Sequence, residues 1–134
     1  MAPKEFFDHL ARRALSQQMS PEIVREIEEA GAQQRTIVLH IYRTDNTTLV
    51  GSYGFSYRGT GRFRYHDGGL LDPTVQVALT DRTFWDIMLE NVGAWTAYRQ
   101  ALLTFQSADN RTFYHVSFLI KLFSYLEDEL RAML

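Results

Sequence analysis

The sequence contains no cysteine, and this absence excludes several classes of function. Disulfide scaffolds, thiolate metal sites and cysteine nucleophiles all require that side chain. We expect a cytoplasmic protein, because a chain without disulfides is compatible with a reducing compartment. Long hydrophobic runs are lacking as well: the most apolar stretch, residues 116–126, is interrupted by Ser117, Lys121 and Ser124. It is too short and too polar to cross a bilayer as a helix.

A large excess of charge of one sign is also lacking. The chain carries 14 basic and 16 acidic residues, for a net charge of −2, so we expect no nucleic acid partner. The four histidines (His9, His40, His66 and His115) show no metal-ligand spacing. P-loop, GxSxG and glycine-rich dinucleotide motifs are absent. We therefore predict no metal, no cofactor and no catalytic residue.

What the sequence does contain is ordinary globular composition. Hydrophobic residues make up 46% of the 134 and charged residues 22%, values typical of a folded domain rather than a disordered chain. This length is usual for one domain, and no linker, repeat or low-complexity tract divides it. We therefore predict a single domain over residues 1–134.

The N-terminal part of the sequence favours helices. Apolar residues recur at helical spacing over residues 7–15, with charged residues between them. Ser20 followed by Pro21 is a helix start signal, because serine suits the N-cap and proline suits the first helical position. Gly31 is expected to end this second, short helix.

The middle of the sequence favours strands. Alternating apolar and polar residues predict strands at 36–43, 48–58, 62–66 and 75–79, separated by turn-forming residues. Four strands joined by short connections indicate an antiparallel meander. A fifth strand is predicted at 101–107.

The helical pattern resumes after Thr80 and Asp81, both common N-cap residues, and a short helix is expected at 94–100. The last helix, from Thr112 to near the C-terminus, is apolar over a wider arc than one buried stripe requires. Such a helix needs two apolar neighbours. One is expected to be the sheet, and the other is a second helix, a bound apolar ligand or a partner subunit. The residues expected to line one face of this helix are Phe113, Val116, Ile120, Phe123 and Leu130.

Basic and aromatic residues alternate around the turn at 59–61. Arg58, Arg62 and Arg64 are interleaved there with aromatic side chains. Arginine beside aromatic rings can hold a phosphate and a stacked base, or it can meet anionic lipid headgroups at a membrane surface. The remaining interpretation is an exposed hairpin whose arginines are solvated.

In residues 72–113, an acidic residue and proline lead into a strand, a helix with a buried aromatic follows, and a break at glycine precedes a short helix and another strand. In this series of motifs the segment resembles the sterol carrier protein type 2 family. Ala101 and the pair Ala108-Asp109 stand where the family usually has glycine around that last strand. The residues that carry the resemblance are Asp72, Pro73, Val75, Val77, Leu79, Phe84, Gly93, Ala97, Leu102 and Leu103.

The resemblance implies an α+β fold: about five strands in a mostly antiparallel sheet, covered on one face by helices, with an apolar cavity or tunnel. Members of that family bind sterols, fatty acids or acyl-CoA, and no catalytic residues come with the fold. A mostly apolar pocket is typical of small-molecule sites. The ligand-binding residues expected here are Phe84, Ile87, Met88, Trp95, Tyr98, Phe105, Phe118 and Leu122.

The leading hypothesis is therefore non-catalytic binding or transfer of an apolar, lipid-like ligand, with Arg58, Arg62 and Arg64 meeting its headgroup or a transient anionic membrane surface. Two alternatives stay open. One is a homodimerising or accessory subunit whose C-terminal helix forms the interface. The other is a small α+β enzyme that uses His40 or Asp86.

Overall fold

The computed structural model describes residues 3–16, 35–45, 47–57, 63–66, 75–106 and 112–133. The predicted short helix at 21–30 lies outside these residues. The helices predicted around 7–15, after Thr80 and Asp81, at 94–100 and from Thr112 onwards are confirmed, as are five strands. The elements are α1 (Pro3–Ser16), β1 (Arg35–Tyr42), β2 (Leu49–Tyr57), β3 (Phe63–His66), β4 (Val75–Thr80), α3 (Asp81–Met88), α4 (Ala94–Arg99), β5 (Leu103–Phe105) and α5 (Thr112–Met133).

The strands form one sheet in the order β3-β2-β1-β4-β5. Three of the neighbouring pairs are antiparallel, and β1 pairs with β4 in parallel, with Ile37 opposite Val75 and Ile41 opposite Leu79. The mostly antiparallel sheet is confirmed, but the four-strand meander was wrong. β4 lies beside β1 rather than beside β3, because both strands carry an alternating apolar face and are buried most completely at the centre of the sheet.

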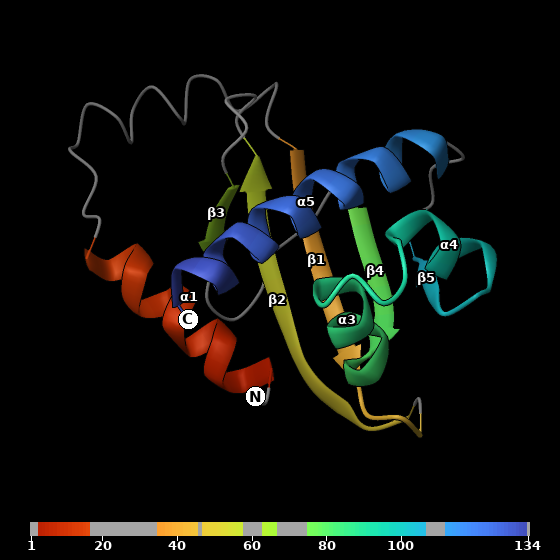
Figure 1. Ribbon diagram of the computed structural model, residues 1–134, viewed down its shortest axis with the longest axis horizontal. Helices are drawn as coiled ribbons and strands as arrows, with labels where there is room; N and C mark the ends of the chain where they lie inside the picture. The colour runs from red at the N-terminus through yellow and green to blue at the C-terminus, as the bar shows by residue number, and fades with distance from the viewer. Residues whose placement is uncertain are drawn as a thin grey trace.

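The helices cover one face of the sheet (Figure 1). Ile37, Leu39 and Ile41 point toward them and are fully buried, whereas the alternate residue His40 points to the other face and is partly exposed. Because successive side chains of a strand point to opposite faces, this pattern gives the sheet one apolar and one more polar side. The predicted α+β arrangement with one covered face is confirmed.

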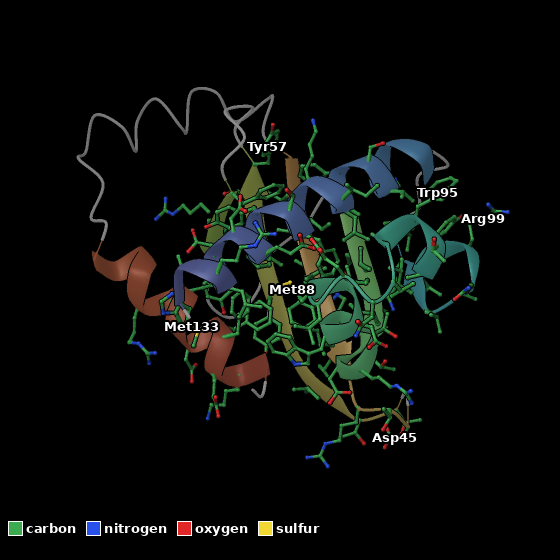
Figure 2. All side chains as sticks on the ribbon, in the orientation of Figure 1. Asp45, Tyr57, Met88, Trp95, Arg99 and Met133 are labelled. Carbon is green, nitrogen blue, oxygen red and sulfur yellow. The ribbon has the colours of Figure 1, made fainter. Side chains whose placement is uncertain are left out.

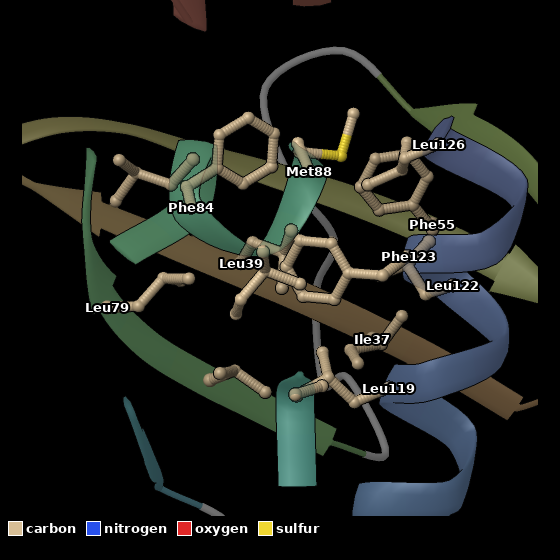
Figure 3. Packing of buried hydrophobic residues seen from close by; sticks show 14 of the residues in the cluster. Ile37, Leu39, Phe55, Leu79, Phe84, Met88, Leu119, Leu122, Phe123 and Leu126 are labelled. Atoms are coloured by element: carbon tan, nitrogen blue, oxygen red, sulfur yellow. The ribbon is translucent and has the colours of Figure 1, made fainter. Parts of the chain in front are cut away.

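The core on the covered side of the sheet contains many aromatic rings. Phe84 of α3 has its ring 5.8 Å from that of Phe123 on α5 and 5.6 Å from that of Phe7 on α1. Phe7 in turn stacks on Tyr53 of β2 with the ring centroids 3.6 Å apart. Figure 3 shows Phe84, Phe123 and Met88 converging above the sheet. Large buried rings contribute much apolar area, so these contacts hold the three helices on the sheet.

The β1–β2 connection is organised by Asp45, at the foot of the molecule in Figure 2. Its carboxylate accepts hydrogen bonds from the backbone N–H groups of Thr47 and Thr48, at 2.9 and 3.0 Å, and from the Thr48 hydroxyl at 2.9 Å. These donors favour the ionised carboxylate and lower its pKa to about 2, with the Thr47 backbone hydrogen bond as the largest cause.

Candidate functional site

A pocket of about 340 Å³ lies between the corner that joins α3 to α4 and the outward side of α5. Its volume is at the lower end of the range of roughly 300–1,000 Å³ that small-molecule sites occupy. The pocket is lined by Ile87, Glu90, Val92, Gly93, Ala94, Ile120, Phe123, Ser124 and Glu127.

The α3–α4 corner is fixed by backbone hydrogen bonds. Thr80 caps the start of α3 by accepting from the Thr83 N–H at 3.2 Å. After the helix ends, Glu90 takes a positive φ of 61°, which turns the chain so that the Asn91 N–H reaches the Asp86 carbonyl at 2.8 Å. This left-handed residue is a common way to close a helix C-terminus. It directs the next residues toward α5.

Gly93 begins α4 in an extended conformation, with φ −77° and ψ 153°. A Cβ atom built there meets nothing within 4 Å. The backbone at this position therefore accepts any L residue, and a larger side chain would enter open space at the border of the pocket.

The lining from α5 follows from helical spacing. Ile120, Phe123, Ser124 and Glu127 are three, four and seven residues apart, which places them along one side of the helix. Phe123 is buried and forms part of the floor, but Ile120 is 47% exposed. Ile120, which was predicted on the apolar face of the last helix, faces the pocket and solvent rather than the core.

The far end of the pocket is charged. Glu90 and Glu127 both line it, and Arg131 lies 3.7 Å from the Glu90 carboxylate and 4.0 Å from that of Glu127. Arg131 also approaches Asp128 at 3.1 Å. The Glu127 side chain is only 20% exposed. Burial raises the pKa of Glu127 above its ordinary value, the Glu90 charge raises it further, and Arg131 acts in the opposite direction.

Five of the predicted ligand-binding residues are buried. Phe84, Ile87 and Met88 lie on α3, and Phe118 and Leu122 lie on α5. Of the whole predicted set, Ile87 is the one that lines this pocket. Phe84 and Leu122 pack together with Met88 in the centre of the core (Figure 3).

Phe118 lies apart from Phe84, near β3 at one edge of the sheet. Its ring is 5.6 Å from that of Tyr57 and 5.4 Å from that of Phe63. The two residues that were expected to face a single cavity therefore contact different aromatic groups. Between them, the described side chains of the sheet and helices pack against one another.

The remaining three predicted residues form a separate aromatic series. Trp95 and Tyr98 of α4 have ring centroids 6.0 Å apart, and Tyr98 is 5.5 Å from Phe105 of β5. Phe105 then contacts His115 of α5 at 5.7 Å. Trp95 is 43% exposed and sits on the outer side of α4 (Figure 2). This series attaches α4 to the edge of the sheet.

The predicted headgroup residues fall largely outside the described part of the chain. Arg58 and Arg62 lie outside the described residues, whereas Arg64 is exposed on β3. Arg64 stands opposite Ser56 in the β2–β3 register, on the face that the helices leave uncovered. Its neighbours Phe63 and Tyr65 are buried on the covered side.

The two residues considered for an enzymatic role do not converge. On the uncovered face, His40 lies between Ser52 and Gln76, with Nδ1 2.7 Å from the serine oxygen and Nε2 2.9 Å from the glutamine oxygen. Asp86 lies on α3, on the covered side, 3.5 Å from the Asn91 side chain. Within the described residues, no group of three or more acidic or histidine side chains is arranged to hold a metal ion.

Sequence reasoning missed most of the pocket residues. The break at Gly93 was predicted, but its place in the wall of a pocket was not. The sequence contains one signal of the pocket: Glu127 lies seven residues after Ile120, on the same side of the last helix. A polar residue on an apolar stripe marks where the stripe reaches solvent.

Comparison with known proteins gives structural neighbours only. The sequence matches no family model and no curated protein. Sterol carrier protein 2 from Yarrowia lipolytica is similar at 12% identity and a TM-score of 0.48, over 89% of this chain and 88% of that one. Sterol carrier protein-2 like-3 from Aedes aegypti is similar at 9% identity and a TM-score of 0.44, over 98% and 99%. The family that the sequence resembles is thus among the matches.

An enzyme is among the neighbours too. The inverting sec-alkylsulfatase Pisa1 from Pseudomonas sp. is similar at 19% identity and a TM-score of 0.42, over 66% of this chain. The match spans 13% of the sulfatase chain.

In the described part of this protein, no helix has the length and apolar character required to span a membrane.

Proposed function

We propose that the protein binds an apolar, lipid-like small molecule, without catalysis, in the pocket between the α3–α4 corner and α5. The observation that carries the proposal is the apolar lining of this pocket. Ile87, Ala94 and Phe123 form a buried floor, and the exposed Ile120 forms a wall. An apolar ligand would remove Ile120 and Val92 from water, and each buried methylene group contributes about 0.8 kcal/mol.

The proposal assigns two roles to the residues predicted from sequence. Ile87 contacts the ligand directly, since it lines the pocket. Phe84, Met88 and Leu122 are buried behind it and hold α3 and α5 at the spacing that leaves the pocket between them. Because the pocket opens to solvent past Ile120, a ligand enters and leaves without unfolding of the core, as transfer requires.

A displacement assay tests the proposal. Nile red, a neutral apolar dye, should bind the protein and be displaced by octanol. Ile120→Ser should weaken dye and octanol binding at least fivefold. Leu102→Ser is the matched control, because Leu102 is 43% exposed but does not line the pocket. Equal binding by both variants would place the ligand elsewhere and reject the proposed site.

Gly93→Leu is a second, blocking variant. The backbone tolerates it and the space is open, so we expect the free energy of unfolding to change by no more than about 0.5 kcal/mol. The added side chain should occupy the edge of the pocket and lower octanol affinity. A variant of unchanged stability that still binds octanol with full affinity would contradict the proposal.

The accessory-subunit alternative is favoured by a different observation. Leu89 is 60% exposed, and it lies with Ile120 and Trp95 on the elements that border the pocket. Under this second proposal, two copies or a partner cover that apolar surface. A melting temperature that rises with protein concentration, and that loses this dependence in Ile120→Ser, would support it. A melting temperature independent of concentration would reject the homodimer.

A further inference from the structure

The apolar pocket ends in an excess of negative charge. Three carboxylates, those of Glu90, Glu127 and Asp128, surround the single guanidinium of Arg131. Two of the three carboxylates line the pocket itself. With all four groups ionised, the local charge is −2, so a ligand that lies in the pocket has its end beside uncompensated negative charge.

The guanidinium does not neutralise the pocket carboxylates closely. Its shortest contact, 3.1 Å, is with Asp128, which does not line the pocket. Its distances to Glu90 and Glu127 are 3.7 and 4.0 Å. Arg131 is also 67% exposed, and an exposed ion pair of this kind contributes little, roughly 0–1 kcal/mol. A second cation therefore has room to compete for Glu90 and Glu127.

The apolar wall and the charged end lie on one side of α5. Ile120 and Glu127 are seven residues apart, which corresponds to about 10 Å along a helix axis. A short alkyl chain laid from Ile120 toward Glu127 would therefore cover the apolar lining and place its terminal group beside the Glu127 carboxylate.

We propose that the preferred ligand of this pocket is an amphiphile with a short apolar body and a protonated amine, held by Glu127 and Glu90, rather than an alcohol or a carboxylic acid. This inference rests on the proposed function, because it assigns the headgroup of a ligand that the apolar pocket already binds. An ammonium group donates to both carboxylates, whereas a ligand carboxylate would meet like charges.

Three probes with the same chain test the headgroup preference: octylamine, octanol and octanoate. Near pH 7 the amine is protonated and the acid ionised. Affinities are measured by calorimetry on the full chain. Octylamine should bind about tenfold more tightly than octanoate, a difference of about 1.4 kcal/mol, with octanol between them. Raising the salt concentration should reduce the amine affinity and leave octanol unchanged, because the carboxylates are partly exposed.

Two variants locate the effect. Glu127→Gln should remove most of the preference for octylamine over octanoate, measured as the ratio of the two affinities within the variant. Glu5→Gln makes the same change of charge on α1, away from the pocket lining, and should preserve the preference. If Glu127→Gln fails to fold, Glu90→Gln and the salt dependence of the parent provide the same test.

The outcomes separate the two proposals. If none of the three probes binds the parent protein, the apolar site itself is wrong and this inference fails with it. If octanol binds but octanoate binds as tightly as octylamine, the apolar site stands and the amine preference is overturned. Amine binding that is equally strong in Ile120→Ser also overturns it, because the amine would then associate with negative charge elsewhere on the surface.

Discussion

The guanidinium of Arg131 lies 3.7 Å from the carboxylate of Glu90, and this contact joins the end of α5 to the corner after α3. Both residues stand at the charged end of the pocket. Arg131 therefore lies close to the two carboxylates, Glu90 and Glu127, that the proposed ammonium group would contact.

Replacement of Arg131 by Gln should strengthen octylamine binding, because the resident cation no longer competes for the two carboxylates. We expect a gain of about threefold to tenfold in affinity, measured by calorimetry. The free energy of unfolding should change by less than about 1 kcal/mol, since Arg131 itself is 67% exposed. Weaker octylamine binding would contradict this competition, and a loss confined to octanoate would indicate that Arg131 binds an anionic headgroup instead.

The raised pKa of Glu127 predicts a pH dependence of stability. Burial disfavours the carboxylate, so the folded protein binds this proton more tightly than the unfolded chain does. The stabilising contribution of Glu127 is therefore fully present when the pH is below the ordinary pKa of 4.5. It is lost as the pH rises through the higher pKa of the folded protein. Glu127→Gln should gain stability relative to the parent between about pH 4 and pH 7.

Chemical denaturation of the variant and the parent, at about pH 4 and at about pH 7, measures this difference in the free energy of unfolding. Comparing the variant with the parent cancels the opposite contribution of Asp45, whose pKa is lowered to about 2. Octylamine affinity should increase over the same pH interval as Glu127 ionises. A stability difference that is constant with pH would contradict the assigned environment of Glu127.

Truncation of Phe84 distinguishes packed core from pocket wall. Its side chain is fully buried among the rings of Phe7, Trp85 and Phe123. Phe84→Ala should therefore lower the free energy of unfolding by roughly 3–5 kcal/mol. Phe118→Ala should cost a similar amount, because Phe118 is 4% exposed. A loss below about 1 kcal/mol for either, measured in urea, would show that the ring already borders empty space.

The elements of the fold were largely predictable from local sequence. The alternation of Ile37, Leu39 and Ile41 marks a strand with one buried face, and Thr80 marks the start of α3. The position of β4 was not predictable in the same way. Val75 pairs with Ile37 across a long sequence separation, and turn residues indicate where a chain reverses without indicating which strand it joins.

The pocket was harder to predict than the fold. The apolar pattern of α5 includes Ile120, but the exposure of Ile120 depends on how far the α3–α4 corner extends over the helix. The chain turns in this corner at Glu90, whose φ is positive, and residue type alone does not indicate that conformation. Trp95 was predicted to bind a ligand, yet the helix that carries it leaves it 43% exposed.

Arginine replacement in the β2–β3 hairpin tests the proposed contact with anionic membranes. Binding to vesicles that contain acidic lipid should decrease as salt increases, since exposed charges are screened over about 8 Å at physiological ionic strength. The double variant Arg62→Ser, Arg64→Ser should lose this binding and keep its stability. Arg99→Ser, an exposed arginine on α4 (Figure 2), is the matched control. Unchanged vesicle binding in the double variant would leave the arginines as solvated side chains.

The most direct test of the central claim is NMR mapping of amide chemical shifts during titration with octanol. The proposed site predicts saturable shifts concentrated in residues 87–94 and 120–127, the two segments that line the pocket, and their loss in Gly93→Leu. Shifts confined to the sheet and the rings around Phe84 would place the ligand inside the core. The absence of saturable shifts would contradict ligand binding by this pocket.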